Sequence, residues 1–370
     1  MRLPLSIAAF FLLAGSACAE PGLDSASGPV DWTIEPSGEA GSVQFQISRR
    51  RGNDHWVVGR TTPVSTLAGL AQTQLAGDGG PVRFALVRDA GTLHCEGVVR
   101  HRHGTGDCSF APDPRFAAAL LARGIAAPSA DEQFAMSLNE IGLAYVDELR
   151  RQHYATPSPA ELVDAGNHGV NLDYVRGMGA RGYRVGSLAA LIRMRDHGVT
   201  PDYVAALAGY GISDIPADEV VRLRDHGVTA DYVGEMRTLG YRGLSVDSLI
   251  QLRDHGVTPD YVRELVRHGI RDVPAEEIAR MRDHGVMPDF VGALAANGFN
   301  RFSTDEIVEM RDHGVMPDLI RDLRTLGYTD LSAGDIVRLR DHGVTGDFIR
   351  DVNRGGRRSA EEQVRLRTGE

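Results

Sequence analysis

The chain has 370 residues, which is long enough for two or three ordinary domains. Hydrophobic residues make up 42% and charged residues 24%, as is typical of soluble globular proteins, and the formal net charge is -10. This acidic balance, without a basic patch interleaved with aromatic residues, argues against a nucleic-acid partner. All 40 basic residues are arginine, which excludes a lysine Schiff base.

The first nineteen residues have the pattern of an export signal. An arginine precedes a short apolar run over residues 3–13, and residues 17–19 read Ala-Cys-Ala, a small-residue cleavage site. The run is too short to span a bilayer, and no later segment approaches eighteen apolar residues. We therefore expect cleavage after Ala19, no transmembrane segment in the mature chain, and a periplasmic or secreted protein. The alternative is a lipid anchor at Cys18, which Gly15 disfavours because lipoprotein signals normally carry Leu there.

Residues 20–30 are rich in Ser, Gly and Pro and predict a flexible leader. Apolar and polar residues then alternate around Phe45, Phe84 and Leu93, which is the period-two pattern of half-buried strands. Gly-rich breaks, including the segment 103–106, supply the expected turns. We predict a small antiparallel β domain over residues 31–111.

Two cysteines remain once the signal is removed, Cys95 and Cys108, and two in an oxidising compartment indicate one disulfide. They lie on either side of the expected turn, so strands folding back there place them opposite one another. A metal site that includes His94, His101 and His103 is the alternative, but the cysteine spacing matches no strong metal motif. We expect a cross-strand disulfide with exposed histidines.

The tetrapeptide Asp-His-Gly-Val recurs every 29 residues, and a period in this range indicates stacked supersecondary units. An aromatic or apolar residue and a glycine recur in the same register. Eight full units are predicted over residues 129–360. A half unit over residues 112–128 precedes them, and residues 361–370 form a C-terminal cap or tail.

The unit that begins at Ser245 shows why each repeat starts with a helix. Ser245 is a good N-cap, and an apolar stripe follows it. Gly256 falls where a left-handed residue ends a helix, with His255 as the C-cap. Val257 can then contact Leu252, which completes a Schellman motif.

A second helix follows at once in the same unit. Thr258 is its N-cap, Pro259 fits the first helical position, and Gly269 ends it. Tyr261 and Leu265 lie on its buried face. Each helix has about ten residues and is marginal alone, so stacking on neighbours must stabilise it, as in solenoids.

The recurring Asp-His pair is the clearest candidate for a surface with a function. Successive histidines should lie about 10 Å apart, too far to share one metal ion, and a histidine at a helix C-terminus is favourable in itself. An aspartate there opposes the helix dipole by about 0.3–1 kcal/mol. We predict that each Asp accepts hydrogen bonds from amides of the following helix or from an Arg of the next unit. Without such contacts the row becomes a candidate partner surface, which comprises Asp196, His197, Asp225, His226, Asp254, His255, Asp283, His284, Asp312, His313, Asp341 and His342.

The recurring aromatic position, from Phe116 to Phe348, has the spacing of stacked core residues, with a ligand-stacking groove as the alternative. The chain has no His-Glu-x-x-His, nucleophile elbow, phosphate loop or dinucleotide fingerprint. We therefore predict no enzymatic activity, no cofactor and no metal.

Residues 252–262, Leu-Arg-Asp-His-Gly-Val-Thr-Pro-Asp-Tyr-Val, resemble repeats of some bacterial membrane metallopeptidases of the beta-lactam-sensor type. In those proteins similar helical repeats trail the extracytoplasmic end, and the β segment 80–110 with residues 112–116 resembles what precedes them. The resemblance covers the chain from about residue 30 onward. Because the membrane helices and the zinc motif are lacking, it implies a detached sensor or interaction module without peptidase activity.

The expected fold is mostly α: an α-solenoid of helix-pair repeats with a small N-terminal antiparallel β domain. The expected function is that of a non-catalytic exported repeat protein, a protein-binding scaffold or signalling module. One alternative is an extracytoplasmic sensor of a small molecule or cell-wall fragment that uses the β domain, and another is a structural envelope-associated protein. Exposed positions that differ between units should set specificity, and they include Ala205, Gly234, Arg263 and Gly292.

Overall fold

The computed structural model describes residues 30–51, 54–77 and 79–369. The predicted export signal, Cys18 and all but the last residue of the leader lie outside the described residues. The chain divides into two compact units, which are considered separately. One comprises residues up to Ala144 together with Pro157–Val163, and the other comprises Tyr145–Thr156 and everything from Asp164 onward.

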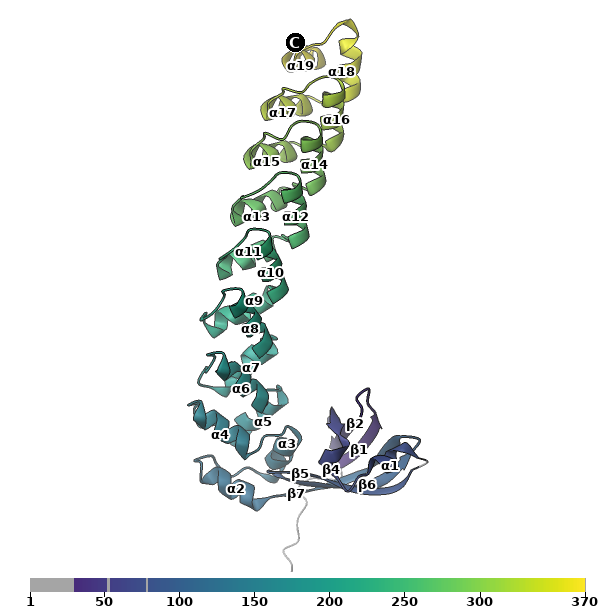
Figure 1. Ribbon diagram of the computed structural model, residues 1–370, viewed down its shortest axis with the longest axis vertical. Helices are drawn as coiled ribbons and strands as arrows, with labels where there is room; N and C mark the ends of the chain where they lie inside the picture. The colour runs from purple at the N-terminus through teal and green to yellow at the C-terminus, as the bar shows by residue number, and fades with distance from the viewer. Residues whose placement is uncertain (1–29, 52–53, 78, 370) are drawn as a thin grey trace, which may run out of the picture. The chain divides into compact units, whose positions relative to one another are not determined.

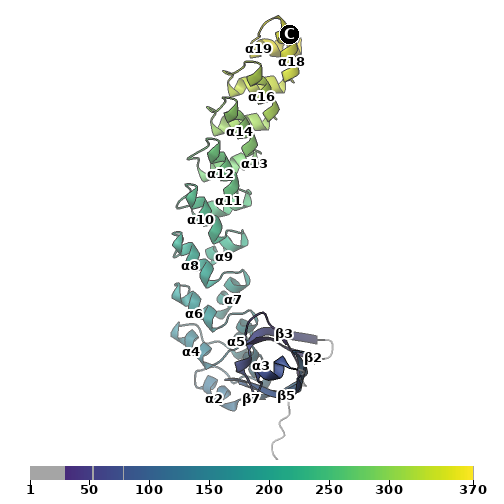
Figure 2. The same ribbon diagram turned by 45° about the vertical axis from the view of Figure 1, so that its right-hand side comes forward.

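The first unit is built on one curled antiparallel sheet, as predicted (Figures 1 and 2). Seven strands within the described residues follow the order β3-β2-β1-β7-β6-β5-β4. A 3-10 turn, η1 (Val64–Thr66), and a short helix, α1 (Gln72–Ala76), lie between strands. The strands are β1 (Val30–Pro36), β2 (Ser42–Arg51), β3 (Asp54–Pro63), β4 (Leu67–Ala68), β5 (Gly80–Arg88), β6 (Gly91–Arg100) and β7 (His103–Pro112).

The core of this sheet centres on Trp32, which is 0% exposed. Its ring meets Phe84 edge-on at 5.0 Å between centroids, and its Nε1 donates to the backbone oxygen of Glu96 at 3.0 Å. The indole lies against Gly104 and Gly106 of β7. A Cβ at either glycine would lie 2.8 Å from an indole atom, so these positions admit only glycine.

This packing corrects the predicted turn at residues 103–106, which belong to β7. The β6–β7 turn lies instead at His101 and Arg102, whose φ angles of 50° and 67° are those of a tight hairpin turn. The glycines that indicated a turn in the sequence are required by the neighbouring indole.

The predicted disulfide between Cys95 and Cys108 is confirmed, and it joins directly opposed residues of β6 and β7. Both cysteines are 3% exposed, so the bond lies within the sheet core. A cross-link over a separation of 13 residues stabilises a fold by about 3 kcal/mol, mainly by restricting the unfolded chain.

Reduction of this disulfide should therefore lower the free energy of unfolding of the first unit by about 2–3 kcal/mol. Tryptophan fluorescence during urea unfolding can measure this, because both tryptophans of the chain, Trp32 and Trp56, lie in strands of this unit. A Cys95→Ala/Cys108→Ala variant should start at the reduced value and show no response to reductant. Equal midpoints for the oxidised and reduced protein would contradict the prediction.

The first helix of the predicted repeats belongs to this unit instead of the array. Helix α3 (Ala130–Leu138) follows α2 (Pro114–Leu121) and packs on β6 and β7. Phe134 and Leu138 join the sheet core, and Asn139 accepts a hydrogen bond from Arg60 of β3 at 2.9 Å. Helix α3, which the sequence assigns to the first repeat, is therefore part of the β domain.

The helix pairs of the predicted solenoid stack in chain order from α4 onward (Figure 1). They make up the second unit, except that α4 up to Ala144 and α5 up to Val163 are counted with the first. None of the described helices is long and apolar enough to cross a membrane. A 3-10 turn, η2 (Asn353–Gly355), precedes the last helix. The helices are α4 (Leu143–Arg151), α5 (Pro159–Asn167), α6 (Leu172–Ala180), α7 (Leu188–Asp196), α8 (Pro201–Gly209), α9 (Ala217–Asp225), α10 (Ala230–Thr238), α11 (Val246–Asp254), α12 (Pro259–Arg267), α13 (Ala275–Asp283), α14 (Pro288–Ala296), α15 (Thr304–Asp312), α16 (Pro317–Thr325), α17 (Ala333–Asp341), α18 (Gly346–Val352) and α19 (Ala360–Thr368).

The capping signals act as the sequence predicts. Gly256 has a φ of +67°, and the amide of Val257 donates to the Leu252 oxygen at 2.9 Å, the long bond of a Schellman motif. Thr258 then accepts from the Tyr261 amide at 3.2 Å and starts the next helix. The Schellman bond recurs from unit to unit, and the threonine cap recurs in α8, α10 and α18, so each 29-residue segment becomes one helix pair.

Candidate interaction surface of the repeat array

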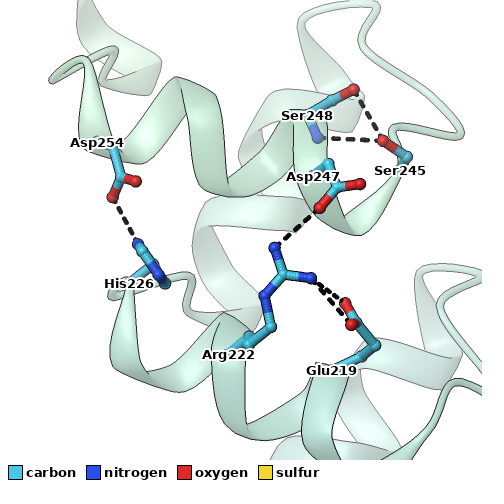
Figure 3. A network of polar contacts seen from close by, with 7 residues as sticks. All are labelled: Glu219, Arg222, His226, Ser245, Asp247, Ser248 and Asp254. Atoms are coloured by element: carbon cyan, nitrogen blue, oxygen red, sulfur yellow. Dashed lines mark hydrogen bonds and ion pairs between the residues drawn. The ribbon is translucent and has the colours of Figure 1, made fainter.

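In six successive repeats, from His168 to His313, the histidine contacts the aspartate of the next repeat. In Figure 3, Nδ1 of His226 donates to Oδ1 of Asp254 at 2.8 Å. The predicted partners of Asp254, helix amides or an arginine, are thus replaced by the imidazole of the preceding repeat. The same contact joins His168–Asp196 (2.8 Å), His197–Asp225 (2.5 Å), His255–Asp283 (2.8 Å), His284–Asp312 (2.8 Å) and His313–Asp341 (2.9 Å).

These contacts explain the unfavourable aspartate at each helix end. The histidine is the C-cap of its own helix, as predicted, and its ring links two neighbouring helix C-termini. The carboxylate of Asp196 raises the pKa of His168 through their hydrogen bond, and Asp341 does the same for His313. The rings are 39–42% exposed, so each pair is screened by water and contributes modestly.

The raised pKa values of His168 and His313 predict a pH-dependent stability. Since the folded pKa lies above the unfolded value of about 6.5, the stabilisation is complete below that pH and is lost as pH rises through the folded pKa. We expect the melting temperature of the array to fall between pH 6 and 8, about 1–2 °C in all. The carboxyl groups whose pKa is lowered, such as Glu148 and Glu161, matter only at more acidic pH.

Far-UV circular dichroism melts across this pH range measure the effect. An Asp196→Asn/Asp341→Asn variant removes both carboxylates and keeps an acceptor for the imidazole. Its melting temperature should change less with pH than that of the parent protein. An equal slope in both proteins would assign the pH dependence to other groups.

A second row of contacts joins the arginine before the recurring Asp to the ladder residue of the preceding repeat, wherever that residue is aromatic. The guanidinium carbon of Arg253 lies 5.0 Å from the Tyr232 ring centroid, within cation–π range. The Tyr232 hydroxyl donates to the Val257 oxygen at 3.1 Å. The equivalent cation–π pairs are Arg195–Tyr174, Arg224–Tyr203, Arg282–Tyr261, Arg311–Phe290 and Arg367–Phe348, and the equivalent hydroxyl contacts are Tyr174–Val199, Tyr203–Val228 and Tyr261–Val286.

The aromatic ladder is therefore core, as predicted, and not a groove for ligands. Its members from Phe116 to Phe290 are buried, whereas Leu319 and Phe348 near the C-terminal end are half-buried. Burial raises the pKa of Tyr232 to about 12, so the phenol stays protonated and donates its hydrogen bond at physiological pH.

A third row crosses from first helix to first helix. Arg222 donates to Glu219 of its own helix and to Asp247 of the next repeat, the latter at 2.9 Å (Figure 3). Arg193 makes the same step to Asp218 at 2.6 Å. These pairs are largely exposed and contribute little energy, but they fix which neighbours meet.

Three of the four positions expected to set specificity contact the preceding repeat, and Arg263 does so by donating to Glu235 at 3.0 Å. A Cβ at Gly234 would lie 2.7 Å from the Tyr210 ring, and one at Gly292 would lie 2.8 Å from the His268 ring. These glycines thus leave room for a large side chain of the preceding repeat, which corrects their assignment to a free surface. Ala205 is exposed, as expected.

The first unit carries a shallow hollow of about 690 Å³ over β5, β6 and β7. Arg83, His94, Glu96 and Asp107 line it, and Arg83 pairs with Glu96 at 3.4 Å. His94 thus lies in the hollow, whereas His101 belongs to the β6–β7 turn. Within the described ranges no group of three His, Cys, Asp or Glu side chains is arranged to hold a metal ion.

Sequence reasoning missed the arginine and tyrosine contacts between repeats. Their signal was present, since the arginine before each Asp-His pair and the aromatic residue recur in the same 29-residue register. No protein-family model matches the chain, and no curated protein does.

Proposed function

We propose that this chain is a non-catalytic exported repeat protein that binds a protein partner along its helical array, as a scaffold or signalling module. One observation carries the proposal: the recurring Arg, Asp, His and Tyr side chains are already bonded to the neighbouring repeat. The repeated residues thus build the frame, and the exposed side chains that differ between repeats are left for a partner. Stacked repeats of this kind offer an extended surface.

The second helix of each pair presents such differing side chains. Its last position is exposed in successive repeats and changes in size and charge along the array. A surface that varies in this way can match one partner and reject others. The residues are Gly209, Thr238, Arg267, Ala296 and Thr325.

Export is supported by two features. The N-terminal segment has the order of a cleaved signal, with cleavage after Ala19. The Cys95–Cys108 disulfide is the kind of bond that persists in oxidising compartments. The resemblance of the repeat phrase to sensor-type membrane metallopeptidases further supports an interaction module derived from an extracytoplasmic receptor.

Site-specific photo-crosslinking in the producing cell tests the proposal. A photoreactive residue replaces Thr238, Arg267 or Ala296 on the second-helix face, and control variants carry it at Val87 of the first unit, which is 59% exposed. We expect one discrete protein adduct from the array positions and none from the control. Adducts from Val87 alone, or none from any position, would contradict binding by the array.

A second candidate function is favoured by the hollow over β5, β6 and β7. Its mixed charges and its volume of about 690 Å³ suit a small zwitterionic ligand such as a cell-wall fragment. Muropeptides added to the mature protein should then raise the melting temperature of the first unit, and an Arg83→Ala variant should abolish the shift. The absence of any shift in the parent protein would remove this candidate.

A further inference from the structure

Two successive repeats break the capping rule that the others follow. In α8, α10, α12 and α18 a threonine side chain accepts the amide hydrogen at the helix start. In α14 and α16 the same position is Met287 and Met316, and neither helix has a side-chain cap. Loss of such a cap costs about 1 kcal/mol per helix, so the exchange is unfavourable for the fold.

The two methionines are also unlike the other methionines of the described chain. Met287 is 46% exposed and Met316 is 51% exposed. An apolar side chain in water adds no packing energy. The remaining methionines are each at most 1% exposed, and they are Met136, Met178, Met194, Met236, Met281 and Met310.

The sulfur of each of these two methionines lies beside an arginine of the cation–π row that joins neighbouring repeats. Nη1 of Arg282 lies 3.0 Å from Sδ of Met287, and Nη1 of Arg311 lies 3.5 Å from Sδ of Met316. The same guanidinium groups lie over the aromatic rings of the preceding repeats, at 5.2 and 5.1 Å from the centroids. A thioether is a weak acceptor, so each sulfur binds its arginine donor only weakly. Nη1 of Arg311 also donates to the Val315 oxygen at 2.9 Å.

We propose that Met287 and Met316 form a paired oxidation site at which methionine sulfoxide is accepted by the fold. Hydrogen peroxide is the oxidant. A sulfur lone pair attacks one peroxide oxygen, the O–O bond breaks, and proton transfer releases water as the sulfur gains one oxygen and loses two electrons.

The sulfoxide oxygen is a much stronger acceptor than the thioether sulfur, and it forms beside a guanidinium group in both repeats. Oxidation of a buried methionine disrupts a core, because it places a polar group among apolar side chains. Oxidation of Met287 and Met316 instead adds charge-assisted hydrogen bonds to Arg282 and Arg311. It also turns an apolar spot on two adjacent repeats polar, and methionine sulfoxide reductases can reverse the change.

Limited peroxide treatment of the mature full-length chain, followed by peptide mass mapping and thermal melts, tests the proposal. We expect Met287 and Met316 to gain one oxygen each at least about tenfold faster than the buried methionines. The melting temperature of the oxidised array should exceed that of untreated protein, because each sulfoxide gains a charge-assisted hydrogen bond. Oxidation spread evenly over all the methionines, or a melting temperature that does not rise, would overturn the proposal.

Two variants separate the contact from general effects of peroxide. The Met287→Thr/Met316→Thr protein restores the cap of the neighbouring repeats, so it should fold, start at a higher melting temperature and show no change on treatment. An Arg282→Gln/Arg311→Gln protein keeps both methionines and loses the charged donors. If its melting temperature responds to oxidation as that of the parent does, the sulfoxide–guanidinium contact is refuted.

Discussion

Replacing Trp32 with alanine should lower the free energy of unfolding of the first unit by about 3–5 kcal/mol. The indole is fully buried and contacts Phe84. Its loss leaves a cavity against Gly104 and Gly106, which carry no side chain to fill the space. The Glu96 oxygen also loses the indole donor of a partly buried hydrogen bond, which adds to the cost.

Amide hydrogen exchange followed by mass spectrometry suits this measurement, because it does not depend on the removed tryptophan. Peptides from β1, β6 and β7 should exchange much faster in Trp32→Ala than in the parent protein. Val87→Ala provides a matched control in the same sheet, since Val87 is 59% exposed and its truncation should change stability by less than about 0.5 kcal/mol. If Trp32→Ala lowers the free energy of unfolding by less than about 1 kcal/mol, the strands around Gly104 and Gly106 can close into the cavity.

The glycines beside Trp32 also show which part of the β domain cannot be predicted from the sequence. Alternation around Phe45, Phe84 and Leu93 indicates strands correctly, because burial on one face imposes period two. The segment 103–106 looks like a turn, because glycine is locally favourable there. Its glycines are needed because Trp32, far away in the sequence, packs against them. Such a tertiary contact cannot be read from the local sequence pattern.

The array was predictable for a different reason. Its start and stop signals act within one helix pair, as Gly256 and Thr258 show, so local chemistry defines each unit. The partners of Asp254 were not predictable in this way. Choosing between an amide, an arginine and the imidazole of His226 requires the rotation between repeats, which the sequence period does not give.

Gly234 and Gly292 were wrongly predicted to lie on a binding surface, for a related reason. They look variable because neighbouring repeats carry Ala or Arg there, and variation is typical of a binding surface. In the structure, the variation follows the side chain stacked on top, Tyr210 or His268. Differences between repeats therefore mark a binding position only where the side chain is also exposed, as at Ala205.

Replacing Tyr232 with alanine should destabilise the middle of the array by about 3–5 kcal/mol. Tyr232 is 4% exposed and contacts the next repeat twice, through the Arg253 guanidinium and through its hydroxyl bond to the Val257 oxygen. Tyr232→Phe keeps the ring and its cation–π contact and loses only the hydroxyl. It should cost about 1–2 kcal/mol, since the Val257 oxygen is left without that donor.

The consequence for the whole array follows from its nearest-neighbour stabilisation. Each helix pair is too short to persist alone, so a weak interface between the repeats of α10 and α11 should uncouple the two halves. In Tyr232→Ala we expect chemical unfolding to separate into two transitions, with hydrogen exchange fastest in α9 to α12. Tyr232→Phe should retain one transition at a lower midpoint. One cooperative transition in Tyr232→Ala, shifted no further than in Tyr232→Phe, would mean that contacts beyond adjacent repeats hold the array together.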